Sequence, residues 1–285
     1  MYVTHENQVE VLDPDSGKVV GVIHDAPGVH GVAISPDLQR GFTSNGADTS
    51  VSVFDTKTLK VLRKIAVNSP DFIFYDAFSR RVFPMSKITS VLDAQTGEML
   101  SQLDLGGSPE SAASDGNGTL YVNLADKAAV AVVDTKALQV INTFPIERCT
   151  SPHSLSYDAD GKRLLIGCSN GFRAVDAGTG KMVGAALMCG GVDASAFDRV
   201  SKLVFESCGE GVLSVIRQIT PDVYDLIDSV PTKILAKTMA FDPKTKRIYL
   251  STANVEWIQG ADPHSNAAPR PRVKPGTFRV LVLEP

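Results

Sequence analysis

The sequence lacks several features that would assign a function directly. It contains no apolar run of the roughly 18 residues that a membrane-spanning helix needs, and its first residues, MYVTHENQ, do not form a secretory signal. Its net charge is −4 with the two signs well mixed, so it has no basic stripe to neutralise nucleic-acid phosphates. The composition therefore gives no support for nucleic acid as a partner, and the sequence contains no apolar run long enough for a membrane span.

Common catalytic and cofactor motifs are also absent. The chain contains no P-loop, no G-x-G-x-x-G after a strand, no H-E-x-x-H and no G-x-S-x-G. It therefore has no nucleotide or flavin motif and no serine nucleophile elbow. No segment has the periodicity of an amphipathic helix, which favours an all-β fold.

The chain does contain a repeat of about 41 residues. Its clearest copies end in an alternating strand followed by Asp and a hairpin turn, as in VSVFDTKTLKVL and TSVLDAQTGEML. The turn aspartates are Asp13, Asp55, Asp93, Asp134 and Asp176, and Arg217 takes their place in a sixth copy. Each unit contains four short strands, which is typical of a β-propeller blade. The sequence predicts one seven-bladed β-propeller domain over residues 1–285.

The strand count predicts that this ring is incomplete. We call the strands of a blade A to D from the axis outward. Seven B and seven C strands can be counted, but only six A and six D strands. We therefore expect strand A of blade 1 and strand D of blade 7 to be missing, and we interpret the chain as N-terminally truncated. A long insertion loop, residues 253–277, separates strands B and C of the last blade and is predicted to overhang the ring.

Several phrases recur in register with this repeat. They are RIYLST, MYVTHENQVEVLD and TLYVN, with V-x-V-x-D and T-G-K after them. They resemble the YVTN family of β-propeller repeat proteins, which includes YncE-like proteins, over essentially the whole chain. The resemblance implies the propeller fold and an exported or surface-associated protein, but no particular activity. One copy departs from the pattern, because RRVFPMSKITSVLD is about three residues short between strands B and C.

Ionisable residues occupy one fixed position of the repeat, five residues ahead of the turn that follows strand A. Strands A line the central channel of a propeller, so these residues are predicted to form a ring around one mouth of the channel. The six ring residues are His30, Asp71, Glu110, His153, Asp193 and Lys237.

Histidine and carboxylate side chains suit divalent ions such as Ca²⁺, Mg²⁺, Mn²⁺ or Zn²⁺. His30, Glu110, His153 and Asp193 are therefore the candidate metal ligands. Lys237 would hold an anionic group of a ligand or pair with a carboxylate. The alternative is that these polar side chains only solvate the channel mouth.

The four cysteines form two pairs with the same spacing of 19 residues. Cys149 and Cys189 each precede a strand A, and Cys168 and Cys208 each end the strand B that returns beside it. We predict the disulfides Cys149–Cys168 and Cys189–Cys208, which would place the protein in an oxidising compartment, periplasmic or secreted. A four-thiolate metal site and free core thiols are the other interpretations, although the chain contains no C-x-x-C.

Two functions from different classes follow. The first is an exported, non-catalytic binding propeller that presents the ring to a small ligand, a metal ion or a protein partner, with Trp257 and His264 of the insertion closing over it. The alternative is a metal-assisted hydrolase of the lactonase type, in which a metal polarises a carbonyl and a carboxylate acts as base. Its site would consist of His30, Asp71, Glu110, His153 and Asp193.

Overall fold

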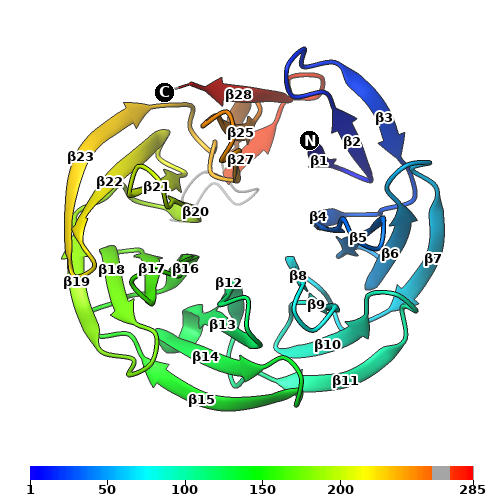
Figure 1. Ribbon diagram of the computed structural model, residues 1–285. Helices are drawn as coiled ribbons and strands as arrows, with labels where there is room; N and C mark the ends of the chain where they lie inside the picture. The colour runs from blue at the N-terminus through cyan, green and yellow to red at the C-terminus, as the bar shows by residue number, and fades with distance from the viewer. Residues whose placement is uncertain (259–269, 285) are drawn as a thin grey trace, which may run out of the picture.

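The strands form separate antiparallel sheets around a central axis, as Figure 1 shows for this computed structural model. The structure describes residues 1–258 and 270–284. Five of the sheets in the ring have four strands, and the sheets at the two ends of the chain have three. Among the described residues, the one helical element is the 3-10 turn η1 (Ala125–Lys127). The predicted all-β, seven-bladed propeller is confirmed.

Each blade is a consecutive stretch of the chain. Blade 1 contains β1 (Tyr2–His5), β2 (Gln8–Leu12) and β3 (Val19–Ile23). Blade 2 contains β4 (Val29–Ser35), β5 (Arg40–Asn45), β6 (Ser50–Asp55) and β7 (Val61–Ala66). Blade 3 contains β8 (Ile73–Asp76), β9 (Arg81–Pro84), β10 (Ile88–Asp93) and β11 (Met99–Asp104). Blade 4 contains β12 (Pro109–Ser114), β13 (Thr119–Leu124), β14 (Ala129–Asp134) and β15 (Gln139–Pro145).

The second half of the ring repeats this order. Blade 5 contains β16 (Pro152–Asp158), β17 (Arg163–Cys168), β18 (Gly171–Asp176) and β19 (Met182–Ala186). Blade 6 contains β20 (Val192–Asp198), β21 (Leu203–Cys208), β22 (Val212–Thr220) and β23 (Val223–Pro231). Blade 7 contains β24 (Met239–Phe241), β25 (Ile248–Thr252) and β28 (Arg279–Leu283). Between β25 and β28, the strands β26 (Val255–Ile258) and β27 (Arg270–Val273) form a separate two-stranded sheet.

Blades 1 and 7 have one strand fewer than the others, as the strand count predicted. In blade 2, β5 pairs with the inner strand β4 on one side and with β6 on the other. The equivalent strand of blade 1 is β1, and within the described residues it pairs with β2 alone. In blade 7, β28 likewise pairs with β25 alone over the part of the chain that the structure describes. The described residues therefore supply no inner strand to blade 1 and no outer strand to blade 7.

The repeated aspartates close the turns between strands C and D. Asp134 Oδ1 accepts hydrogen bonds from the backbone N–H groups of Lys136 and Ala137, at 2.8 and 2.7 Å. These N–H groups lower the pKa of the Asp134 carboxyl below its ordinary value. Asp13 accepts from the Ser16 N–H in the same way, at 2.8 Å. The D-P-D-S-G stretch is therefore a hairpin turn, and the aspartates of the repeat serve the fold.

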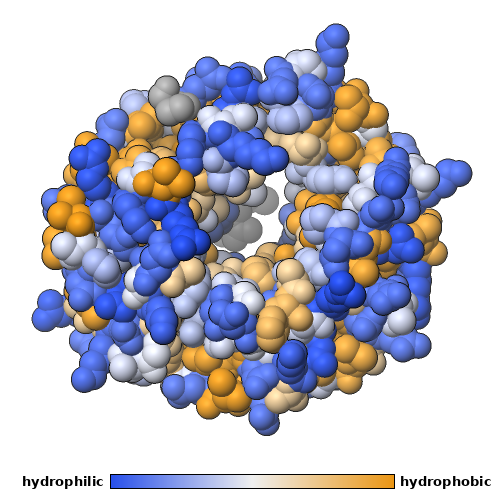
Figure 2. Space-filling view, viewed as in Figure 1, coloured by the Kyte–Doolittle hydropathy of each residue, from blue (hydrophilic) through white to orange (hydrophobic). Residues whose placement is uncertain are grey.

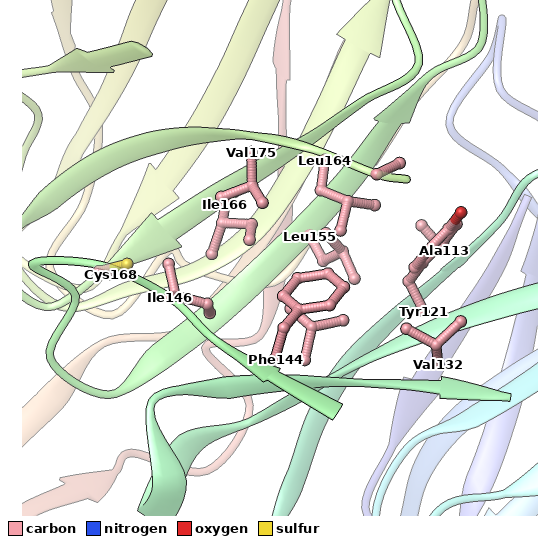
Figure 3. Close-up of a cluster of buried hydrophobic side chains, with 12 residues drawn as sticks. Ala113, Tyr121, Val132, Phe144, Ile146, Leu155, Leu164, Ile166, Cys168 and Val175 are labelled. Atoms are coloured by element: carbon pink, nitrogen blue, oxygen red, sulfur yellow. The ribbon is translucent and has the colours of Figure 1, made fainter. Parts of the chain in front are cut away.

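The hydrophobic core lies between neighbouring blades. In the cluster of Figure 3, Val132 and Phe144 of blade 4 pack with Leu155, Leu164 and Val175 of blade 5. These side chains are at most 8% exposed. Burying a side chain of this size stabilises the folded state by about 1.5–3 kcal/mol. Contacts of this kind between blades fix the inner strands around the axis, and with them the residues at the channel mouth.

Candidate functional site

The six ring residues all lie where the inner strands begin. His30, Glu110, His153 and Asp193 are the second residues of β4, β12, β16 and β20, whereas Asp71 and Lys237 each lie two residues before β8 and β24. The loops between blades meet the loops between strands B and C at this end. Gly46 N–H donates to Gly28 O at 3.0 Å, and Gly209 N–H donates to Gly191 O at 2.8 Å. The register of the repeat thus gathers the ring residues at one mouth of the channel.

The ring residues form three pairs, each between neighbouring blades. His30 Nδ1 lies 2.8 Å from Asp71 Oδ1, between blades 2 and 3. His153 Nδ1 lies 3.3 Å from Glu110 Oε2, between blades 5 and 4. Lys237 Nζ lies 2.7 Å from Asp193 Oδ1, between blades 7 and 6. Every ring residue therefore contacts a polar side chain of another ring residue on the adjacent blade.

This pairing bears on the metal-ligand hypothesis. Within residues 1–258 and 270–284, no three or more His, Cys, Asp or Glu side chains are grouped so that they could hold a metal ion. The candidate ligands His30, Glu110, His153 and Asp193 belong to three different pairs around the mouth. The structure thus distributes these donors around the channel and does not bring them to one point.

A pocket of about 650 Å³ lies at this mouth between blades 3 and 4. Asp71 and Glu110 line it from the two blades, and Ser86 and Lys87 line it from the connection between β9 and β10. This connection is the one that the repeat leaves about three residues short. The other lining residues are Asn68, Ser69, Ile88, Gln102, Ser108 and Pro109. Figure 2 shows the hollow at the centre of the ring. The volume of the pocket is that of a typical small-molecule site.

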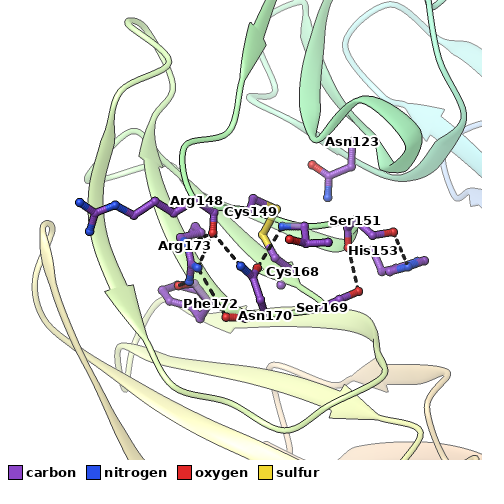
Figure 4. The surroundings of a disulfide bond; sticks show 12 residues. Asn123, Arg148, Cys149, Ser151, His153, Cys168, Ser169, Asn170, Phe172 and Arg173 are labelled. Carbon is purple, nitrogen blue, oxygen red and sulfur yellow. Dashed lines mark hydrogen bonds between the residues drawn. A yellow bond between two sulfur atoms is a disulfide. The ribbon is translucent and has the colours of Figure 1, made fainter.

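Both predicted disulfides are present, Cys149–Cys168 in blade 5 and Cys189–Cys208 in blade 6. No cysteine is free, so the four-thiolate and free-thiol interpretations are wrong. Figure 4 shows that Cys149–Cys168 lies close to the ring residue His153, whose Nε2 is 3.1 Å from the Ser151 hydroxyl. Each disulfide therefore fixes the loop that leads into an inner strand at the channel mouth.

The insertion of blade 7 contributes the hairpin of β26 and β27. Trp257 pairs with Pro271 in this hairpin and is 54% exposed. Among the described residues, no hydrogen bond, ion pair or aromatic contact joins Trp257 to a ring residue. His264 lies outside the described residues. Closure of the insertion over the ring stays a prediction.

Glu206 is a buried carboxyl that the sequence analysis missed. It lies on β21 with no exposed surface, and the Ser154 hydroxyl of blade 5 donates to its Oε2 at 2.5 Å. Its Oε1 has no hydrogen-bond partner. Burial raises the pKa of Glu206 to about 8, which favours the protonated form of the side chain. The signal was present in the repeat, because Glu206 of LVFESC stands where RLLIGC has the apolar Ile166.

Comparisons with known proteins agree with this architecture. No family model matches the chain. Two curated relatives, each called "Uncharacterized protein YncE", come from Salmonella typhi and Salmonella typhimurium (strain LT2), and both are 30% identical over 177 residues. The alignment covers 58% of this chain and 48% of each relative. The chain thus spans about half the length of the curated relatives it matches.

Solved structures share the fold at low sequence identity. A chain in the crystal structure of the mitotic checkpoint complex gives a TM-score of 0.76 at 15% identity, with 87% of this chain and 79% of that chain covered. A chain of Kuenenia stuttgartiensis hydrazine synthase gives a TM-score of 0.75 at 17% identity, with 98% and 90% covered. Both similarities concern the fold alone.

A search for membrane spans finds no helix in the described part of the chain that is long and apolar enough to cross a bilayer. The order of the blades and the in-register strand motifs agree with this partial similarity to two YncE proteins. The chain is thus a seven-bladed β-propeller that is similar to YncE proteins over part of its length.

Proposed function

We propose that this protein is a non-catalytic binding propeller whose ligand occupies the pocket between blades 3 and 4 at the channel mouth. The observation that carries the proposal is the placement of Asp71 and Glu110, two ring carboxylates from adjacent blades, in one pocket of about 650 Å³. Pockets of roughly 300–1,000 Å³ suit small molecules. The shortened connection between β9 and β10 is the sequence feature that accompanies this pocket.

The lining of the pocket indicates the chemistry of the ligand. Asp71 and Glu110 accept hydrogen bonds from a cationic amino group, while Lys87 can pair with an acidic group. The amides of Asn68 and Gln102 add neutral hydrogen-bonding groups. A small zwitterion that carries both an amino group and a carboxylate satisfies all three charged side chains, so free amino acids and short peptides are the proposed ligand class.

The first experiment measures binding by isothermal titration calorimetry. Glycylglycine and free α-amino acids are the probes, and simple amines and simple carboxylic acids of similar size are the comparison ligands. Saturable binding of zwitterions, weakened at least tenfold by Lys87→Met and by Glu110→Gln, supports the proposal. Lys18→Met serves as the matched control because Lys18 is exposed and lies outside the pocket. Failure of every zwitterion to bind would refute this ligand class.

The lactonase alternative receives no support from the described residues, because it needs metal ligands that converge. Elemental analysis of the purified protein tests it, together with a lactone hydrolysis assay with and without chelator. Stoichiometric metal and chelator-sensitive turnover would establish hydrolysis and overturn the proposal of a non-catalytic protein.

We also propose a periplasmic or secreted location. The two disulfides and the similarity to YncE support an oxidising compartment. The test is to alkylate free thiols in intact cells of the native host before lysis and to measure the mass of the protein without reduction. A protein that carries four alkyl groups would be reduced in the cell, which contradicts this location.

A further inference from the structure

Two strand edges that are paired in the four-stranded blades are unpaired at the ends of the ring, in the part of the chain that the structure describes. One is the inner edge of β1, and the other is the outer edge of β28. An unpaired edge presents a row of backbone N–H and C=O groups that can accept a further strand. Both edges belong to the junction of blades 7 and 1, which lies between β28 and β2 in Figure 1.

The inner edge of β1 has the geometry of a strand-acceptor site. Met1 and Leu12 exchange both backbone hydrogen bonds, each 2.8 Å long. Since such pairs alternate along an antiparallel ladder, the N–H and C=O groups of Tyr2 and Thr4 point away from β2, toward the free edge. A cavity of about 380 Å³ adjoins this edge, with residues 1–4, residues 30–32 of β4 and residues 238–240 beside β25 in its lining.

The outer edge of β28 adjoins a second, apolar cavity of about 530 Å³ between blades 6 and 7. Leu213 and Val215 line it from blade 6, and Ile248 and Leu283 line it from blade 7. Because the burial of apolar side chains away from water lowers the free energy, the cavity favours an apolar or aromatic occupant.

The interface between blades 5 and 6 shows which side chain fills the place of this apolar cavity elsewhere in the ring. There, Val204 and Ile216 of blade 6 pack against Phe172 of blade 5, and Tyr224 from the outer strand β23 completes the cluster. The Tyr224 and Phe172 rings lie 5.1 Å apart, and Tyr224 is 4% exposed. By the register of the repeat, Ile248 and Leu283 correspond to Val204 and Ile216. No residue in the described part of the chain takes the place of Tyr224 in blade 7.

One segment can reach both edges, because the outer strand of each blade leads directly into the inner strand of the next. β23 of blade 6 is followed by β24 of blade 7, for example, within residues 222–241. We propose that the free edges of β28 and β1 form one docking site for an extended polypeptide segment of about twenty residues. Its first half carries an aromatic residue into the apolar cavity, and its second half lies antiparallel to β1.

The probe is a fluorescein-labelled synthetic peptide with the sequence of residues 222–241, which contains Tyr224. Fluorescence anisotropy with the purified 285-residue protein is expected to show saturable binding. A peptide with Tyr224→Ala is expected to bind at least tenfold more weakly, and a scrambled peptide is expected not to bind. Equal binding of the authentic and scrambled peptides, or no binding at all, would overturn the proposal.

Two protein variants test the β1 edge. Thr4→Pro removes an N–H that points to the free edge and is expected to weaken binding at least tenfold, whereas Thr4→Val keeps the N–H and should bind like the unaltered protein. Because Thr4→Pro can also disturb folding, hydrogen exchange of the unaltered protein is measured as well. The peptide should slow exchange at β1 and β28 specifically. Protection of these edges by self-association without peptide, seen as a concentration-dependent dimer, would show that a second copy is the occupant and would contradict the proposal.

Discussion

The Ser154 hydroxyl of blade 5 donates a 2.5 Å hydrogen bond to Oε2 of Glu206 in blade 6. Both side chains are fully buried. Burial removes an ionised carboxylate at this position from water, and serine hydroxyls offset only part of this cost, so burial favours the protonated form. This contact places a titratable group inside the interface between two blades.

Glu206 should make the stability of the protein fall as the pH rises. In the unfolded chain its pKa is about 4.3, whereas burial raises it to about 8 in the folded state. Between these values the folded state binds one more proton than the unfolded state, so its stabilising contribution is full below about pH 4 and is lost by about pH 8. The expected slope is at most about 1.4 kcal/mol per pH unit. Urea denaturation from pH 5 to 8.5 measures it.

The variant Glu206→Gln isolates this effect, because glutamine keeps the shape of the protonated acid. Relative to the unaltered protein, it should become more stable as the pH is raised toward 8. Glu98→Gln, at an exposed position, is the control and should leave the pH profile unchanged. An identical pH dependence of Glu206→Gln and the unaltered protein would show that Glu206 does not titrate in this range.

Gly167→Ala should destabilise the same interface. A Cβ at Gly167 would lie 2.3 Å from the Ser154 hydroxyl oxygen and 2.9 Å from Glu206 Oε2, so both side chains would have to move. Overpacking of this kind costs about 1–3 kcal/mol. Gly178→Ala is the matched control, because its Cβ would meet only Asp176 Oδ1 at 3.6 Å. Urea denaturation at pH 6 compares the two, and equal stabilities would contradict the packing seen here.

Removal of one disulfide should lower stability by about 3 kcal/mol, because a cross-link over a loop of this length restricts the unfolded chain. The double variant Cys149→Ala/Cys168→Ala tests blade 5, and Cys189→Ala/Cys208→Ala tests blade 6. The two bonds have the same sequence separation of 19 residues, so similar losses are expected in denaturation experiments without reductant. A loss well below 1 kcal/mol for both pairs would argue that the hairpins are already ordered in the unfolded chain.

The pairs of the ring should contribute little to stability. Lys237 and Asp193 are 47% and 29% exposed, and ion pairs of this kind are worth about 0–1 kcal/mol. Lys237→Met should therefore change the free energy of unfolding by less than about 1 kcal/mol. Arg163→Met is the contrasting variant and should lower stability more than Lys237→Met. Arg163 is only 14% exposed and contacts Asp176 at 2.6 Å and Asp222 at 2.8 Å. A large loss for Lys237→Met would mean that the ring serves the fold.

The repeat predicted the architecture well because its signals are local. Strands, turn aspartates and the positions of the cysteines each depend on residues within one blade, so their spacing predicted the blade count, the missing strands and both disulfides. The same register also predicted which residues begin the inner strands, and His30 and Asp193 lie there.

The contacts between blades were harder to predict. The pairing of His30 with Asp71 depends on how adjacent blades are rotated relative to each other, which the repeat does not encode. Glu206 was missed because it is the one charged residue in an otherwise mostly apolar strand B. Such a residue is expected to point to solvent, whereas here nearly the whole strand is buried. The pocket at Lys87 could not be predicted, because the sequence shows the short connection between β9 and β10 only as a gap in the repeat. How this connection shapes the surface depends on the three-dimensional structure.

The three pairs of the ring connect only some of the neighbouring blades at the channel mouth. They connect blade 2 to blade 3, blade 4 to blade 5 and blade 6 to blade 7, so no ring pair crosses from blade 3 to blade 4. The pocket between Asp71 and Glu110 lies at this uncrossed boundary. A change in the separation of blades 3 and 4 would therefore break none of the three ring pairs.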